Sequence, residues 1–245
     1  MRIDVYFTPL GVMPADLAGR PVLVVDILRA TTTIVEALAS GAKAVVPVAA
    51  ADEAIRIAQN LEKGTVLLAG ERKGERIEGF ALGNSPREMT EEAVSGKILV
   101  MSTTNGTHAI GVAEPGSPVF IGAATNFTAA AAAAREAAQQ GGSLVILCAG
   151  RERMFALEDA YAAGRFALAM IEPGERRKVE LNDAGLAALE IVRRYGEKWK
   201  RAIAASAAAR ALRDIGFKAD VLAAASVDCH TIVPRYENRR VTLEG

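Results

Sequence analysis

Residues 22–33 read VLVVDILRATTT. Four aliphatic residues lead into Asp26, and Arg29 and three threonines follow shortly after it. Such a β-branched run predicts a buried strand, and the polar residues behind it predict a turn at the start of a helix. Because ligands of open α/β sheets bind beyond the carboxyl ends of the strands, this turn is a candidate functional site.

The alternation of strand and helix continues along the chain. Strands are predicted at 2–7, 21–26, 44–48, 65–69, 97–101, 118–122 and 143–148. Helices between and after them are predicted at 32–40, 51–62, 86–95, 107–113, 126–140 and 157–171. Strands that are apolar on both faces are typical of a mostly parallel sheet covered by helices, so we expect an α/β fold.

The pattern changes in the last quarter of the chain. From about residue 183 it becomes mainly helical, with Gly196 as a predicted helix stop. The final segment, 231–245, predicts a returning edge strand. No low-complexity linker interrupts residues 1–245, so we expect a single domain.

Composition and charge exclude several classes of function. The 245 residues are 51% hydrophobic and carry 29 basic and 29 acidic side chains. A non-specific nucleic-acid binder needs clustered positive charge, so no nucleic-acid partner is expected. The start of the chain lacks a signal-peptide core, and no apolar run reaches the roughly 18 residues of a membrane span. We therefore expect a cytoplasmic chain with no membrane partner.

Four loops that follow predicted strands hold most of the side chains able to do chemistry. They are residues 26–33, 70–86, 102–107 and 149–159. The 70–86 loop, GERKGERIEGFALGNSP, is long for a compact domain, and such loops are usually functional. Each loop also has a structural interpretation, because Asp, Ser and Thr cap helices and acids are stabilised near helix N-termini.

Carboxylates follow these strand ends repeatedly. The four candidate metal ligands are Asp26, Glu71, Glu158 and Asp159. Oxygen-only sites suit Mg²⁺, which keeps several waters and bridges to a substrate phosphate. The sequence therefore predicts a Mg²⁺ site.

The sequence supports a cysteine- or histidine-based site less well than a carboxylate site. Cys148 ends an apolar strand, which predicts a buried, inert thiol. Position 154 is Met, where a cysteine phosphatase loop would need arginine. The two histidines, His108 and His230, are too few and too scattered for a histidine-based site.

Several of these motifs together resemble one family. VVDILRATTTIVEAL, GERKGERIEGFALGNSP, STTNGT and CAGRERMFALEDAYAAG resemble, in this order, the 2-phosphosulfolactate phosphatase family over about residues 1 to 235. The resemblance implies a three-layer α/β/α fold with a largely parallel or mixed sheet. It also implies a Mg²⁺-dependent phosphatase that converts (2R)-2-phospho-3-sulfolactate to 3-sulfolactate and phosphate, a step in coenzyme M biosynthesis.

A substrate with a phosphate, a sulfonate and a carboxylate needs many donors, and three loops of this sequence offer them. Asp26 would hold Mg²⁺, and Glu71 or Asp159 would act as the base for a metal-activated water. An aspartyl-phosphate on Asp26 is the other route, and the sequence leaves both open. Arginine forks and hydroxyls before helices bind anions. The candidate substrate-binding residues are Arg29, Thr31, Thr32, Thr33, Arg72, Asn84, Ser85, Ser102, Thr103, Thr104, Asn105, Gly106 and Thr107.

Other classes of protein share parts of the pattern. A haloacid-dehalogenase-type phosphatase needs aspartate at position 28, which is Leu28, and a phosphoribosyltransferase loop needs a second acid at Ile27. A non-catalytic anion-binding module would keep the threonine loops but has no use for four carboxylates. A phosphatase for another small phosphorylated hydroxy acid also fits. The partner is in each case a small anionic molecule, and a homodimer is left open.

Overall fold

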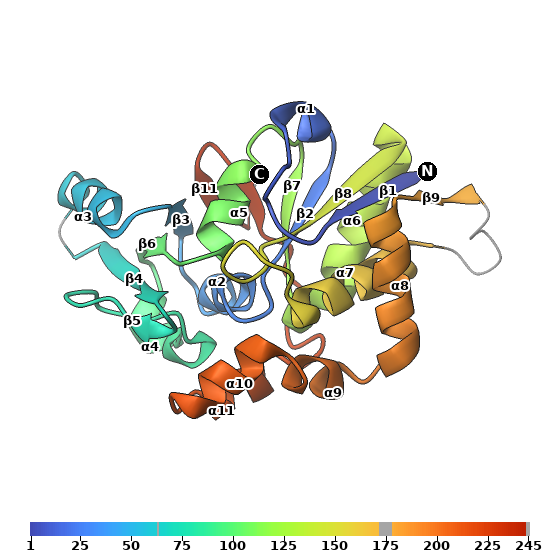
Figure 1. Cartoon of the computed structure of the whole chain (residues 1–245). Coiled ribbons are helices and arrows are strands. Elements are labelled where there is room, and N and C mark those ends of the chain that lie inside the picture. Colours follow the sequence, from blue (N-terminus) through green and yellow to red (C-terminus); the bar gives the residue numbers. More distant parts are fainter. Residues whose placement is uncertain (63, 172–177, 244–245) are drawn as a thin grey trace.

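The computed structural model describes residues 1–62, 64–171 and 178–243, which form one mixed sheet with helices on both faces (Figure 1). The strands run in the order β5-β4-β6-β3-β11-β10-β7-β2-β8-β1-β9. Their bounds are β1 Arg2–Tyr6, β2 Val22–Val25, β3 Ala44–Val48, β4 Val66–Arg72, β5 Glu75–Arg76, β6 Ile98–Ser102, β7 Val119–Gly122, β8 Ser143–Cys148, β9 Glu180–Leu181, β10 Arg235–Glu237 and β11 Arg240–Thr242.

Helices connect most of these strands. Their bounds are α1 Pro14–Leu17, α2 Ala30–Ala39, α3 Ala51–Gln59, α4 Glu91–Val94, α5 Gly106–Val112, α6 Phe127–Gly141, α7 Leu157–Met170, α8 Asp183–Tyr195, α9 Trp199–Ala204, α10 Ala207–Asp214 and α11 Lys218–Ala223, with short 3₁₀ turns η1 Pro86–Glu88 and η2 Ala124–Asn126. The predicted mainly helical region after residue 183 is confirmed by α8 to α11, and Gly196 ends α8 with a positive φ of 59°.

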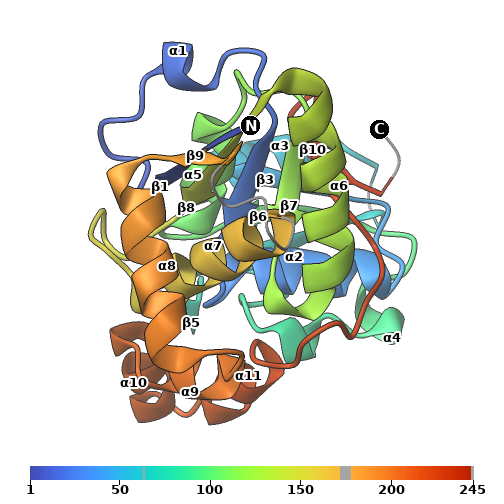
Figure 2. The ribbon, with the colours of Figure 1, turned by 90° about the vertical axis from the view of Figure 1, so that its right-hand side faces the viewer.

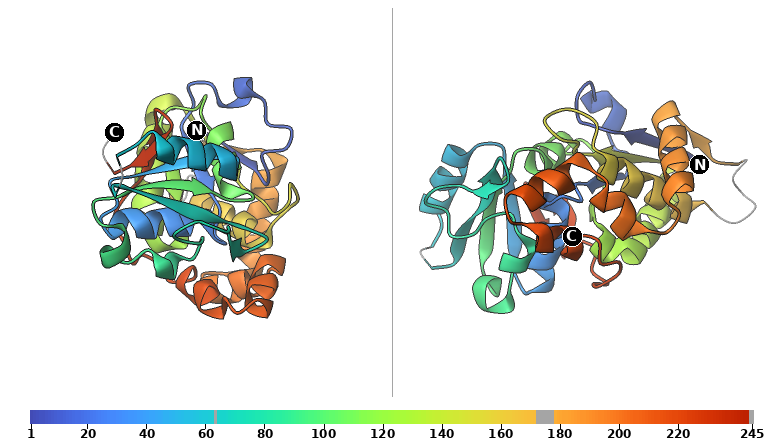
Figure 3. Two further views of the ribbon diagram at one scale, coloured as in Figure 1. Left: turned by 90° about the vertical axis from the view of Figure 1, so that its left-hand side faces the viewer. Right: turned by 60° about the horizontal axis from the view of Figure 1, so that its bottom comes forward.

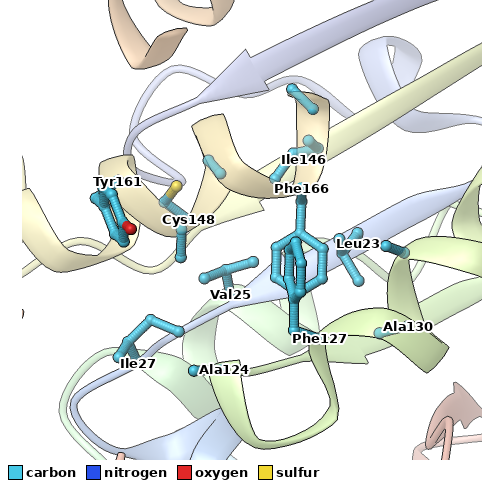
Figure 4. Close-up of a cluster of buried hydrophobic side chains, with 14 of the residues drawn as sticks. Leu23, Val25, Ile27, Ala124, Phe127, Ala130, Ile146, Cys148, Tyr161 and Phe166 are labelled. Carbon is cyan, nitrogen blue, oxygen red and sulfur yellow. The ribbon is translucent and has the colours of Figure 1, made fainter. Parts of the chain in front are cut away.

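Alternate side chains of β2 enter two different cores, which is what makes the fold three-layered. Leu23 and Val25 pack with Phe127 of α6 and Phe166 of α7, whose ring centroids lie 5.0 Å apart (Figure 4). Figure 2 shows α6, α7 and α8 together in front of this face of the sheet. All of these side chains are largely or fully withdrawn from water, which is the main favourable contribution to folding.

The opposite face of β2 packs on other helices. Val22 and Val24 point into a core that contains Ile34 of α2 and Ile110 of α5. The predicted three-layer α/β/α arrangement with a mixed sheet is therefore confirmed. None of the helices in the described residues is long and apolar enough to cross a membrane. The cytoplasmic location, the single domain and the oligomeric state stay predictions.

The sheet consists of two groups of parallel strands joined by a hairpin. Strands β4, β6 and β3 are parallel to one another, as are β7, β2, β8, β1 and β9. The hairpin of β10 and β11 pairs antiparallel with β7 on one side and with β3 on the other. The prediction of an edge strand in 231–245 is wrong, because this segment lies between the two groups, with 244–245 outside the described residues.

Two other predicted elements differ from the structure. The single helix predicted at 86–95 is wrong, because Ser85 caps η1 and Thr90 caps α4, which makes two short turns. Helix α2 begins at Ala30, so the three threonines lie inside its first turns and not in the turn before them. Polar caps and buried threonines override the apolar spacing that the prediction used.

The C-terminal helices form a separate group beside the sheet. Figure 1 shows α9, α10 and α11 along the lower side of the molecule, and the right-hand view of Figure 3 brings them forward. They pack against α7, against α8 and, through α11, against η1. This places α11 close to the 70–86 loop.

The hairpin position can be tested through Val241, which is fully buried and faces Val45 of β3. Replacing Val241 with alanine should lower the free energy of unfolding by about 2 kcal/mol, because two buried methyl groups are lost and a cavity remains. Chemical denaturation measures this loss. Val227→Ala is the matched control, because Val227 is 41% exposed and its loss should be near zero. Equal, small effects would contradict the central position of the hairpin.

Candidate active site

One cavity of about 360 Å³ lies where four of the strand-end loops meet. It is lined by the end of β4, by the loops after β2, β4, β6 and β8, by the start of α7 and by α10. The lining residues are Asp26, Leu28, Arg29, Glu71, Lys73, Gly74, Asn84, Thr103, Thr104, Asn105, Gly150, Arg151, Glu152, Glu158, Asp159, Ala208, Ala211, Leu212 and Ile215. All four predicted metal carboxylates therefore reach the same cavity.

Asp26 is fixed at the end of β2 by the first turn of α2. Its backbone N–H and C=O both bond to the hydroxyl of Thr31, at 3.0 and 2.8 Å. Its carboxylate accepts only a long bond, 3.3 Å, from the Ala30 N–H among the described residues. The other carboxylate oxygen lies against Gly106, where a Cβ would stand 2.4 Å away. A residue without a side chain is therefore required at position 106.

Asp159 bridges two strand ends from the first turn of α7. Its Oδ1 accepts the Ile27 N–H at 2.9 Å, and its Oδ2 accepts the Gly150 N–H at 3.1 Å. Glu158 stands beside it, and both side chains are buried. The macrodipole of α7 also stabilises acids in its first turn, so Glu158 and Asp159 contribute to the stability of this helix as well.

Glu71 performs a similar bridge on the other side of the cavity. Its Oε1 accepts the Thr104 N–H at 2.7 Å and its Oε2 accepts the Gly74 N–H at 2.8 Å. The carboxylate thereby ties the end of β4 to the loop after β6. Two backbone donors hold it in one orientation.

Burial, and to a lesser extent the charges of neighbouring acids, disfavours the ionised form of the carboxylates at this cavity. Burial raises the pKa of Asp26 to about 7, and the charges of Glu158 and Glu71 add to this effect against the Ala30 N–H and Arg29. Burial likewise raises the pKa of Asp159 well above its usual range, with Asp26 and Glu158 adding to it. Burial also raises the pKa of Glu158. Ionising all of these acids together therefore needs a compensating cation.

The donor set fits Mg²⁺ in its chemistry. It consists of carboxylate oxygens, and the side-chain oxygen of the lining residue Asn84 is buried with no hydrogen-bond partner in the described chain. No three acidic, histidine or cysteine groups among the described residues converge closely enough to hold an ion by themselves. Mg²⁺ usually takes one or two carboxylates and keeps several waters, so a protein-only cage is not required.

Several predicted substrate-binding residues lie outside the cavity lining: Thr31, Thr32, Thr33, Arg72, Ser85, Ser102, Gly106 and Thr107. Their polar groups bond mainly within the protein. The hydroxyl of Thr32 donates to the Ile27 carbonyl at 2.9 Å, and that of Thr33 to the Asn84 carbonyl at 3.1 Å. Arg72 donates to the hydroxyl of Ser102 at 2.8 Å. Their predicted contact with substrate stays a prediction.

Arg29 lines the cavity, but its guanidinium group points into the protein. It donates to Asp220 at 2.6 Å and to the Gly74 carbonyl at 2.6 Å, and it stacks on the Phe217 ring at 4.6 Å. Both ends of its donor fork are therefore occupied in this structure. Binding of a substrate anion by Arg29 stays a prediction.

Comparison with known proteins shows the family of the chain. Residues 6–239 match the family described as 2-phosphosulpholactate phosphatase. The chain belongs to this family. A probable 2-phosphosulfolactate phosphatase from Symbiobacterium thermophilum is 40% identical over 235 residues, which is 96% of this chain and 99% of the relative.

Further relatives with the same name extend the similarity. Proteins from Caldanaerobacter subterraneus subsp. tengcongensis and Clostridium acetobutylicum are 34% and 33% identical, and they cover 97% and 98% of this chain and 96% and 100% of their own length. Membership of the 2-phosphosulpholactate phosphatase family makes the chain a phosphoric monoester hydrolase.

The structure also adds residues to this family member's site that the sequence patterns did not select. Lys73 and Arg151 line the cavity and bring positive charge to it, and both lie in strand-end loops that are candidate sites from the sequence. Asp220, from α11, meets Arg29 and Ser85. The cations could have been found from their loops, whereas Asp220 lies far away in sequence without a local motif.

The expected inert thiol agrees with the structure. Cys148 is fully buried at the end of β8, and burial raises the pKa of its thiol well above the usual value. A high pKa leaves little thiolate, which is the reactive form.

Gly106 offers a sharp test of the Asp26 geometry. A Cβ at this position would stand 2.3 Å from the Ala30 Cβ and 2.4 Å from Asp26 Oδ2. Gly106→Ala should displace the carboxylate and lower phosphatase activity about 100-fold, as misplacement by about 1 Å can do. Phosphate release measures it. Gly111→Ala, in the same helix with open space around it, should leave activity unchanged. Activity that survives Gly106→Ala would mean that Asp26 does not take part.

Proposed function

We propose that this chain is a Mg²⁺-dependent phosphatase that hydrolyses (2R)-2-phospho-3-sulfolactate to 3-sulfolactate and phosphate. The observation that carries the proposal is a single cavity that combines four buried carboxylates with the cations Lys73 and Arg151. The name shared by the relatives supports the choice of substrate. A place in coenzyme M biosynthesis, a cytoplasmic location and a homodimer belong to the same proposal.

The residues present divide into two roles. Asp26, Glu71, Glu158 and Asp159 would hold the metal, one or two of them directly and the others through water. Bound Mg²⁺ would supply charge neutralisation for the phosphoryl group. Lys73 and Arg151 would bind the anionic groups of the substrate, because cations near a cavity attract and orient multiply charged ligands.

In the first route, a buried carboxylate would accept a proton from the attacking water. Asp159 is held by two backbone donors, which fix its carboxylate beside the cavity for the role of a base. Glu71 is oriented in the same manner. In the second route the Asp26 carboxylate, which accepts one long backbone bond, attacks the phosphorus. The ester P–O bond breaks and the sulfolactate oxygen leaves and takes up a proton, and water then hydrolyses the aspartyl-phosphate to phosphate and free Asp26. Both routes use the same three residues.

Two alternatives are weaker. A non-catalytic anion-binding module has no need to bury four carboxylates beside an anion site, because they repel the ligand unless a cation is present. A phosphatase for another small phosphorylated hydroxy acid uses the same chemistry, and only the choice of substrate separates it from our proposal.

A panel of phosphate esters assayed with Mg²⁺ tests both the reaction and the substrate. We expect kcat/KM for 2-phospho-3-sulfolactate to exceed that for glycerol phosphates by about 10- to 100-fold, because a lost charge-assisted hydrogen bond costs about 1.5–3 kcal/mol. The analogue with carboxylate in place of sulfonate should react at an intermediate rate. Equal rates would exclude a site for several anions, and no hydrolysis at all would favour the binding module.

The raised carboxyl pKa values predict how stability depends on pH without metal. Between the usual carboxyl pKa, about 4, and the Asp26 value of about 7, the folded protein binds more protons than the unfolded chain. The free energy of unfolding in EDTA should therefore fall as the pH rises through this window. Saturating Mg²⁺ should remove the fall, because the ion compensates the ionised acids.

Thermal unfolding at several pH values, with EDTA or with Mg²⁺, measures this effect. Asp26→Asn should flatten the pH dependence in EDTA and abolish the phosphatase activity. A stability in EDTA that rises across the window, or that Mg²⁺ leaves unchanged, would contradict the metal site.

A further inference from the structure

A continuous set of hydrogen bonds leads from α11 to the cavity. Asp220 Oδ2 accepts from Arg29 Nη1 at 2.6 Å, and Arg29 Nη2 donates to the Gly74 carbonyl at 2.6 Å. The Gly74 N–H in turn donates to Glu71 Oε2 at 2.8 Å. One residue, Gly74, thus separates the buried ion pair from a carboxylate of the cavity.

The ion pair at the start of this path is fixed on every side. The side chains of Arg29 and Asp220 are each 2% exposed. Asp220 Oδ1 accepts from the Ser85 hydroxyl at 2.8 Å, so both of its oxygens are in use. The Phe217 ring lies 4.6 Å from the guanidinium carbon of Arg29. A buried pair with this geometry admits few alternative arrangements, because an unpaired charge there is costly.

Gly74 is held equally tightly at the other end. Its φ of +87° is in the left-handed region, and an added Cβ would stand 2.7 Å from Ile215 Cδ1 of the segment after α10. The residue therefore fits between Arg29 and the segment after α10, and its left-handed backbone disfavours any residue with a side chain. Arg29 thus holds the peptide that follows Gly74, and Glu71 accepts from the N–H of the peptide that precedes it, so both contacts meet at this one residue.

We propose that Asp220 is a positioning residue that orients the Glu71 carboxylate through Arg29 and Gly74. The C-terminal helices, which also line the cavity through Leu212 and Ile215, are then part of the site. The expected effect of Asp220 on Mg²⁺ affinity rests on the proposed function. Its expected effect on amide exchange in the 71–76 segment does not.

The test compares Asp220→Asn with a matched variant elsewhere. Asp4 is also 2% exposed and pairs with Arg20 at 2.7 Å, but it lies on β1 and does not line the cavity. Asp4→Asn should also lower the melting temperature, because it leaves Arg2 and Arg20 without their buried countercharge. It should leave the cavity unchanged.

Two measurements separate positioning from general destabilisation. In the metal-free protein, amide hydrogen exchange by mass spectrometry should speed up in the 71–76 segment of Asp220→Asn and not of Asp4→Asn. Titration with Mg²⁺ alone, followed calorimetrically, should show affinity lowered about 10- to 100-fold in Asp220→Asn, as loss of outer ligand-orienting partners does elsewhere. At saturating Mg²⁺ the loss should appear in kcat more than in KM.

Arg29→Lys keeps the buried positive charge, and it provides the same test if Asp220→Asn does not fold. A single ammonium group lacks the two-ended fork that reaches both Asp220 and the Gly74 carbonyl. We expect the same faster exchange and weaker Mg²⁺ binding, and no further loss when both substitutions are combined if both fold.

The outcomes distinguish the two proposals. Unchanged exchange and Mg²⁺ affinity in Asp220→Asn and Arg29→Lys, relative to Asp4→Asn, would overturn the positioning role. If the wild-type protein neither binds Mg²⁺ nor releases phosphate, but exchange in the 71–76 segment is still faster in Asp220→Asn, the orientation of Glu71 is supported and the proposed function is excluded.

Discussion

Repulsion among buried carboxylates is the constraint on which the rest of this structure depends. Asp26, Glu71, Glu158 and Asp159 reach one cavity from two strand ends and the start of α7. Each would be more stable in water, so the fold must hold them by other means. Backbone N–H groups of Ile27, Gly150, Gly74 and Thr104 supply that hold for two of the four, and they leave the cluster in need of positive charge.

The same constraint explains the parts that surround the cluster. Gly106 allows the loop after β6 to approach Asp26, and the Arg29–Asp220 pair anchors the 70–86 loop against the C-terminal helices. A cation in the cavity would relieve the repulsion, and a phosphorylated substrate would bring its own negative charge to that cation. Binding of metal and of substrate are therefore expected to favour each other, since each supplies the charge that the other lacks.

How far the sequence predicts this site depends on whether the deciding contact is local. The strand-end rule located Asp26, Glu71 and Asp159 because a strand, a turn and a helix start can be read within ten or so residues. Burial is a property of the whole fold. The same rule therefore could not show that the hydroxyls of Thr32 and Thr33 are buried and donate to backbone carbonyls. Arg29 and Asp220 are 191 residues apart, and no pattern near either residue indicates the other. The short strands of the hairpin were placed at an edge for the same reason.

The position of that hairpin matters for how the protein forms during synthesis. Strands β10 and β11 fill the gap between β7 and β3, yet they are the last strands of the sheet to leave the ribosome. Until residue 242 has been made, both parallel groups keep an unpaired edge, and unpaired edges template association between chains. A nascent chain of this protein therefore depends on being shielded, by the ribosome or by chaperones, for longer than a protein whose sheet closes early.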